Sequence, residues 1–127
     1  MWQDVGILRT AQGLQRALVT LDELDLRLSR TGVADGDRAF NLSWHDWLNL
    51  KSLVAVGRVI ATSALAREDS RGAHFREDHP HTGDLESSSY IVVTQDGQAL
   101  SMRREPVHFT RVVPGQTILQ EEGEAVA

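Results

Sequence analysis

The chain has 127 residues, of which 41% are hydrophobic, so it has enough apolar material for one small core. Acidic residues outnumber basic ones 18 to 13, and the net charge of −5 argues against a sequence-independent nucleic-acid binder. Cysteine is absent, which excludes a disulfide framework, a thiolate metal site, an iron–sulfur ligand set and a cysteine nucleophile.

The first third of the chain predicts helices. A short helix is expected over residues 1–5, ending at Gly6. Leucine and alanine then recur at steps of three and four over residues 14–28, which predicts a long amphipathic helix. Thr10 can cap its start, and Gly32 lies where a left-handed residue would end it.

A second long helix is expected over residues 44–70. Ser43, followed three residues later by Asp46, resembles a capping box and predicts the start. One broad apolar face, with further apolar residues outside it, predicts that this helix is more buried than the first. Its face also carries small residues that allow a neighbouring helix to approach closely: Gly57, Ala61 and Ala64.

A β-hairpin is expected farther along the chain. Residues 90–94 are aromatic or β-branched, and Asp96-Gly97 is typical of a type I′ turn. Pro106 should interrupt the second strand or mark an edge. With Asp96-Gly97 as the loop, the predicted register places four apolar side chains on one face, in two cross-strand pairs: Val93 with Leu100 and Ile91 with Met102.

The expected fold class is therefore mainly α, in a single domain over residues 1–127. A small antiparallel helical bundle, with two long helices and a short N-terminal one, should occupy residues 1–72. A loop and the hairpin follow over residues 73–120, and an irregular, mobile acidic tail over residues 121–127. No run approaches the roughly 18 apolar residues of a spanning helix, and residues 1–4 lack a signal-peptide pattern. We therefore expect a cytoplasmic location and no direct membrane insertion.

The densest polar stretch covers residues 67–80. Arg67 and Arg71 are four residues apart and would share one face of the last helical turn, where positive charge suits the helix dipole. Gly72 would then end the helix. In this interpretation the stretch is a solvated, capped helix end with local ion pairs.

Two chemical alternatives exist for the same stretch. His74, His79 and His81 with Asp78 offer metal ligands, although their spacing matches none of the usual helical zinc patterns. Ser70, His74 and Asp78 could form a nucleophilic triad, but no nucleophile elbow or oxyanion-hole loop is recognisable. No phosphate-binding glycine motif occurs either. We therefore assign no catalytic, metal-binding or cofactor-binding residue.

The stretch also resembles a hallmark of one protein family. Residues 64–80 are similar to the segment A-L-x-R-x-E-S-R-G-A-H-x-R-x-D-x-P of the FAD-dependent succinate dehydrogenase/fumarate reductase flavoproteins, a family that includes L-aspartate oxidase. Residues 1–9 resemble the M-W-x-x-x-G-I-x-R that opens the family's C-terminal helical domain, and Glu105-Pro106-Val107 resembles the R-P-V of its closing strands. The resemblance covers essentially the whole chain, but only the C-terminal part of the much longer family members.

This resemblance implies a small antiparallel bundle followed by short strands. It also implies that FAD and the dicarboxylate are bound by the FAD-binding and capping domains of the parent protein. None of those motifs occurs here, so we expect FAD in the parent protein and no cofactor in this chain. The arginine-rich segment would organise the surface that packs against the FAD-binding domain or a partner subunit. Its interface residues would be Arg67, Asp69, Ser70, Arg71, Gly72, His74, Arg76 and Asp78.

The chain departs from the family pattern in two places. Asp69 replaces the usual Glu, and residues 81–85 replace an Asp-Asp-Glu-x-Trp stretch, which places the chain near the divergent reductase-like members. We expect a structural domain, inactive alone, that packs on the flavin domain and could dock an electron-transfer subunit. Other subunits could hold it at the inner face of the membrane. The alternative is a free-standing helical interaction module or a homodimer that buries the small-residue face of residues 44–70.

Overall fold

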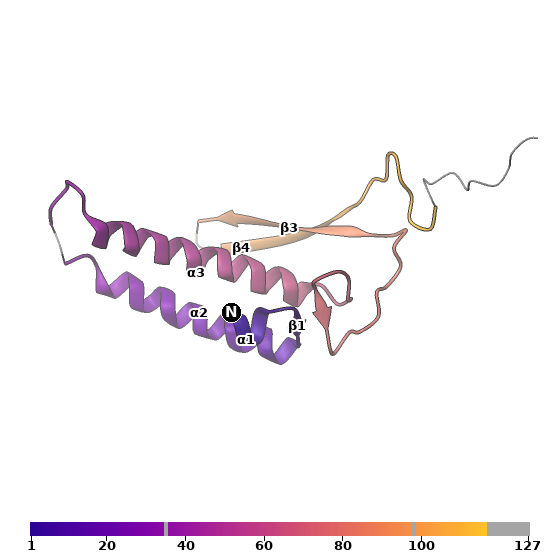
Figure 1. Cartoon of the computed structure of the whole chain (residues 1–127), viewed down its shortest axis with the longest axis horizontal. Helices are drawn as coiled ribbons and strands as arrows, with labels where there is room; N and C mark the ends of the chain where they lie inside the picture. Colours follow the sequence, from indigo (N-terminus) through magenta and orange to yellow (C-terminus); the bar gives the residue numbers. More distant parts are fainter. Residues whose placement is uncertain (35, 98, 117–127) are drawn as a thin grey trace, which may run out of the picture.

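The computed structural model describes residues 1–34, 36–97 and 99–116, so the predicted tail over residues 121–127 lies outside the described residues. The chain folds mainly into helices, as predicted (Figure 1). Two long helices lie side by side and run in opposite directions, and a hairpin lies along the other side of the second helix. The helices are α1 (Trp2–Val5), α2 (Ala11–Thr31) and α3 (Leu42–Ala66). The strands are β1 (Leu8–Arg9), β2 (Phe75–Arg76), β3 (Ser89–Asp96) and β4 (Ala99–Pro106).

Helix α2 begins and ends as its sequence predicts. The hydroxyl of Thr10 accepts a hydrogen bond from the backbone N–H of Gly13 at 3.1 Å. Gly32 follows the last turn with a φ of +61°, a conformation that favours glycine because it has no Cβ. Both signals lie within a few residues of the helix end that they determine, which is why the sequence reveals them.

Both predicted ends of α3 are wrong. The N-cap is Asn41, whose side-chain oxygen accepts from the Trp44 N–H at 2.8 Å, so the helix starts before Ser43. The helix ends at Ala66, and Arg67 is already extended. Gly72 therefore does not end α3. It lies instead, with a φ of +56°, in a tight turn of the following loop.

The core lies between α2 and α3, and α3 is not more buried than α2. Gly57 allows the close approach, since a Cβ atom there would lie 3.2 Å from a methyl carbon of Leu21. Each of the two helices has four buried residues: Gly13, Leu14, Ala17 and Leu21 in α2, and Val54, Gly57, Ala61 and Ala64 in α3. Several other large apolar residues of α3 are exposed, including Leu50, Leu53, Val56 and Ile60.

The hairpin forms, but its register differs by two residues from the predicted one. Asp96 pairs with Ala99, so Asp96 belongs to the strand rather than to the loop. The observed partners of the apolar residues are Met102 for Val93, Arg104 for Ile91 and Gln95 for Leu100. Because side chains alternate with a period of two, this shift leaves the predicted apolar residues on one face. Strand β4 ends at Pro106, as expected.

A parallel pairing of β1 with β2 was not predicted. Leu8 pairs with Phe75 and Arg9 with Arg76, and this brings the start of the chain to the arginine-rich loop. Each strand has only two residues, too few to show a strand periodicity in the sequence.

By length and composition, helix α3 could cross a membrane. Polar residues interrupt its apolar sequence, so it contains no continuous apolar run of the expected length. A core helix of a soluble protein passes the same test. Here the small-residue side of α3 is buried against α2, while its other apolar side is exposed. The absence of membrane insertion stays a prediction.

Candidate functional site

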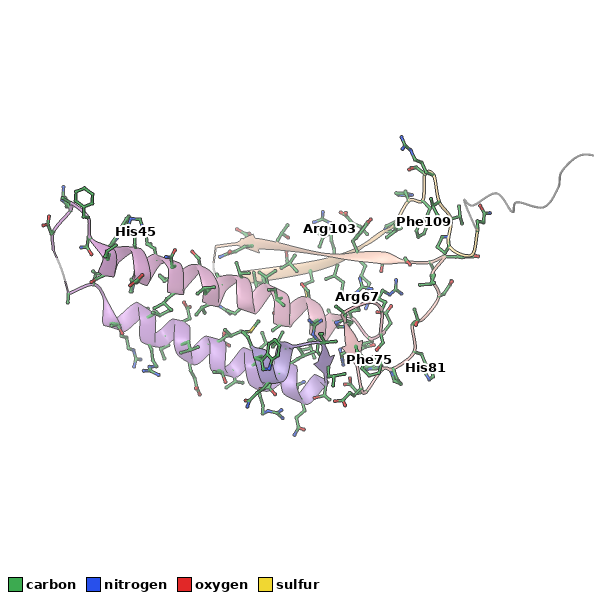
Figure 2. All side chains as sticks on the ribbon, in the orientation of Figure 1. His45, Arg67, Phe75, His81, Arg103 and Phe109 are labelled. Carbon is green, nitrogen blue, oxygen red and sulfur yellow. The ribbon has the colours of Figure 1, made fainter. Side chains whose placement is uncertain are left out.

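The arginine-rich stretch forms a compact loop at the end of α3. Two antiparallel bridges fold the backbone back on itself, one between Arg71 and His74 and one between Arg76 and His79. Figure 2 shows Arg67 and Phe75 at this end of the molecule, whereas His45 lies at the opposite end of α3. We call residues 67–81 the motif loop.

The side chain at the centre of the motif loop is Arg76. Only 1% of its surface is exposed. The Nη1 atom donates hydrogen bonds to three carbonyl oxygens at the end of α3: Ala64 (3.1 Å), Leu65 (3.1 Å) and Arg67 (2.9 Å). The last carbonyls of a helix have no intrahelical partner and carry its negative dipole end. The guanidinium therefore caps α3 from a position ten residues beyond the end of the helix.

Asp78 holds this guanidinium in place and extends the connection to α2. Its two oxygens accept from Nε and Nη2 of Arg76 at 2.7 and 2.8 Å. One of them also accepts from the backbone N–H of Ala11, in the first turn of α2, at 2.8 Å. Hydrogen bonds from Arg76, above all, hold the pKa of Asp78 well below its usual range. The pair thus joins the end of α3 to the beginning of α2.

The hydroxyl of Ser70 closes the motif loop from inside. Ser70 is buried, accepts from the Arg76 N–H at 2.8 Å and donates to the His79 carbonyl at 2.8 Å. It does not contact His74, and Asp78 is bound to Arg76. The triad alternative is therefore not assembled.

Arg67 and Arg71 share a carboxylate rather than a helical face, because both follow the end of α3. Asp69 lies between them, 3.4 Å from Arg67 and in direct contact with Arg71. Arg67 donates to the Ser89 carbonyl at 2.8 Å, and Arg71 donates to the Ser88 hydroxyl at 3.0 Å. These contacts attach the motif loop to the start of the hairpin.

His74 faces the N-terminal segment. Its Nδ1 atom lies 2.5 Å from Nη1 of Arg9 in β1. Burial, with a further contribution from the charge of Arg9, lowers the pKa of His74. Within residues 1–34, 36–97 and 99–116, no group of three or more His, Asp or Glu side chains is placed to hold a metal ion. His74, His79 and His81 are thus not brought together as a ligand set.

Sequence reasoning missed three participants in this site: Arg9, the backbone N–H of Ala11 and Arg104. Arg104 donates to the Ala66 carbonyl at 2.7 Å and adds a second guanidinium to the end of α3. The only sequence signal for Arg9 was its place at the end of the M-W-x-x-x-G-I-x-R pattern. The other two have no local signal, because their partners, Asp78 for Ala11 and the Ala66 carbonyl for Arg104, are distant in sequence.

The model of the family described as the fumarate reductase flavoprotein C-terminus matches residues 1–119. The chain belongs to this family. It is 35% identical over 97 residues to the succinate dehydrogenase flavoprotein subunit of Coxiella burnetii, covering 76% of this chain and 16% of that protein. It is 42% identical over 82 residues to L-aspartate oxidase 1 of Ralstonia nicotianae, covering 65% and 14% of the two chains.

A solved structure supports the same relationship. The chain superposes on E. coli quinol fumarate reductase FrdA with a TM-score of 0.83 and 28% identity, covering 91% of this chain and 20% of that one. The chain thus corresponds to the C-terminal domain of the flavoprotein. It spans about one sixth of the length of each of these two relatives. The resemblance inferred from the motif loop is confirmed.

Proposed function

We propose that this domain packs on the FAD-binding and capping domains of an FAD-dependent oxidoreductase that acts on a dicarboxylate of the succinate or fumarate type. It supplies structure rather than catalytic groups. The relatives' names, succinate dehydrogenase and fumarate reductase flavoprotein subunit, support the substrate class. The site supports the structural role, because the arginines of the motif loop donate to the chain's own carbonyls and carboxylates.

The observation that carries this proposal is an apolar surface at the start of the chain. We define the N-terminal patch as Met1, Trp2, Ile7 and Leu8, and all four are exposed. Trp2 is 92% exposed and Ile7 63%. These side chains border a depression of about 780 Å³ that is lined by residues 1–3 and 5–8. A contiguous apolar patch of this kind is typical of an interaction surface, and a tryptophan alone can bury about 150–250 Å².

The motif loop supports this surface from behind. Strand β1 carries Leu8 and is hydrogen bonded to β2, while Arg76 and Asp78 fix β2 to the ends of both long helices. Because the loop connects α1–β1, α2 and α3, it gives the N-terminal patch a defined position. We therefore propose that the interface residues predicted from the sequence organise the docking surface indirectly, by holding the N-terminal patch in position.

The alternative, a homodimer that buries the small-residue face of α3, is less well supported. Gly57, Ala61 and Ala64 are already buried against α2 within the same chain. The apolar residues that α3 leaves exposed, including Leu53 and Val56, lie outside that buried set. A free-standing module would therefore have to use another face.

Location and further partners belong to the same proposal. Relatives named as subunits of fumarate reductase and succinate dehydrogenase support docking of an electron-transfer subunit. We place the domain in the cytoplasm, held at the inner face of the membrane through other subunits. FAD belongs to the parent flavoprotein.

The test combines the purified chain with the FAD-binding and capping domains of the flavoprotein from the same source. We expect a stoichiometric complex by size-exclusion chromatography with light scattering. Trp2→Ser should weaken the complex by roughly tenfold or more, because buried tryptophans dominate interfaces. The matched control is Phe40→Ser, which removes an exposed aromatic from the segment between α2 and α3 and should leave affinity unchanged. Figure 1 shows that this connection lies at the opposite end of the two helices from β1. A stable homodimer that ignores the flavin domains, or a chain that binds stoichiometric FAD alone, would contradict the proposal.

A further inference from the structure

The contact between Arg9 and His74 is unlike the other arginine contacts of the motif loop. Arg9 Nη1 donates to Nδ1 of the imidazole at 2.5 Å, and Arg9 Nε donates to the Gly6 carbonyl at 2.5 Å. A guanidinium can only donate hydrogen bonds, so Nδ1 of His74 must act as the acceptor and carries no proton. Arg67, Arg71 and Arg76 each contact a carboxylate, whereas Arg9 makes no ion pair within the part of the chain that the structure describes.

Positive charge surrounds the imidazole from three elements. Arg9 faces it from β1, Arg67 from the end of α3, and Arg76 from β2, and each disfavours a charged ring. The nearby carboxylates, Asp69 and Asp78, are already engaged by arginines. Burial of the ring, the largest cause, also lowers the pKa of His74, while the backbone of Arg67 opposes this shift. The Nε2 atom of His74 is buried and has no hydrogen-bond partner among the described residues. The side chains of Ser63 and Tyr90, which carry hydroxyl groups, line the same pocket as the ring.

We propose that Arg9 and His74 form a pH-sensitive latch that holds β1 on the motif loop while the imidazole is neutral and releases it when the imidazole is protonated. Protonation removes the acceptor of Arg9 and places a fourth positive charge among three guanidiniums. The latch concerns this chain by itself and does not rest on the proposed docking to a flavin domain.

Two backbone hydrogen bonds report directly on the latch. The Phe75 N–H donates to the Ile7 carbonyl at 3.1 Å, and the Glu77 N–H donates to the Arg9 carbonyl at 2.9 Å. A pairing of two short strands is weak without further support. Val5 is buried in the core, and Asp4 pairs with Arg16 of α2, so α1 keeps its own anchor when β1 is released. The released part is therefore residues 7–9, which include two members of the N-terminal patch.

The direction of the pH effect follows from the lowered pKa. Release of β1 removes the charge of Arg9 from the imidazole, so the pKa of His74 lies lower with β1 docked than with β1 released. The docked state therefore has its full stability while His74 is neutral, and it loses stability as pH falls and the released state takes up the proton first. The equilibrium between docked and released β1 shifts by at most about tenfold per pH unit.

Amide hydrogen exchange of the chain, resolved by NMR and corrected for intrinsic rates, tests the latch between pH 7.5 and pH 5.0. We expect the protection factors of Phe75 and Glu77 to fall as pH is lowered across this range, by no more than about tenfold per pH unit. The control is the amide of Leu14, a buried residue in the first turn of α2 that donates to the carbonyl of the N-cap residue Thr10, and it should keep its protection. Constant protection of Phe75 and Glu77 across this range would overturn the latch.

A variant separates His74 from the other histidines. His74→Asn can keep an acceptor near the position of Nδ1 but cannot gain a proton, so Phe75 and Glu77 should stay protected at both pH values. The matched control, His81→Asn, changes an exposed histidine nearby and should retain the pH dependence of the wild type. A His74→Asn variant with wild-type pH dependence would overturn the latch. If this variant does not fold, the ¹⁵N chemical shifts of the His74 imidazole in the wild-type chain test the latch instead. They should show a neutral ring at pH 7.5 that titrates together with the loss of protection, and a charged ring at pH 7.5 excludes the latch.

Discussion

Arg76 and Asp78 are two residues apart in sequence, and together they connect the end of α3 to the beginning of α2. The guanidinium binds the carbonyls of two α3 residues and of the C-cap residue Arg67 on one side, and both carboxylate oxygens of Asp78 on the other. The carboxylate in turn accepts from the first turn of α2. A buried guanidinium is strongly unfavourable unless its charge is paired and its N–H groups are satisfied. Both conditions hold here only while the two helix ends stay together.

Replacement of Arg76 by lysine should therefore strongly destabilise the domain. Lysine keeps the charge, but it has no planar fork that can reach the helix carbonyls and both oxygens of Asp78 at the same time. We expect Arg76→Lys to lower the free energy of unfolding by about 1–3 kcal/mol, the usual cost of leaving buried hydrogen-bonding groups without a partner. Urea denaturation followed by circular dichroism measures this change.

The chain contains a matched control with the same sequence spacing. Arg103 and Glu105 also pair at two residues' separation, at 2.6 Å, but their side chains are 56% and 47% exposed on the hairpin (Figure 2). Exposed pairs contribute about 0–1 kcal/mol, so Arg103→Lys should leave the urea midpoint nearly unchanged. Equal losses for Arg76→Lys and Arg103→Lys would contradict the assigned role of Arg76.

Asp78 should make the domain sensitive to acid. Its folded-state pKa is held well below the ordinary value of 3.8, chiefly by Arg76, so the unfolded chain takes up this proton first. The stabilisation is present above about pH 4 and is lost as pH falls below it. We expect the urea midpoint to drop between pH 5 and pH 3, and the drop should be smaller in Asp78→Asn. Asp84, a fully exposed residue whose pKa is lowered mainly by Ser87, provides the control, because Asp84→Asn should keep most of the drop.

Ser70 should contribute to stability and not to chemistry. Ser70→Ala would leave the Arg76 N–H and the His79 carbonyl without their partner in a buried site. We expect a loss of about 1–3 kcal/mol in unfolding free energy. Ser29 also donates through its hydroxyl, to the Leu26 carbonyl, but at an exposed position of α2, so Ser29→Ala should change stability by less than about 0.5 kcal/mol. Equal effects of the two substitutions would argue against a structural role for the buried hydroxyl.

The sequence predicted the features whose physical cause is local. Thr10 and Gly32 lie next to the helix ends that they determine, and the alternation of β3 and β4 survives a two-residue error in register. The motif loop could be recognised as a family hallmark, but its contacts could not be predicted. Arg76 reaches back to α3, and Arg9 reaches His74 across 65 residues of sequence. The residue types near Ala66 do not predict the end of α3, because the side chains that donate to the last carbonyls of α3 come from Arg76 and Arg104.

The start of α3 offers a direct comparison between a predicted and an observed helix cap. Ser43 has the residue type and spacing of a cap, yet Asn41 holds the Trp44 N–H, and Ser43 lies inside the first turn. Asn41→Ala should cost about 1 kcal/mol of unfolding free energy, because a helix N–H loses its acceptor. Ser43→Ala should be neutral or slightly stabilising, since alanine is the better helix former. Urea denaturation of both variants under one condition measures the difference. A larger loss of unfolding free energy for Ser43→Ala than for Asn41→Ala would contradict Asn41 as the cap. It would indicate that Ser43 caps α3, as the sequence predicted, and that the helix starts at Trp44.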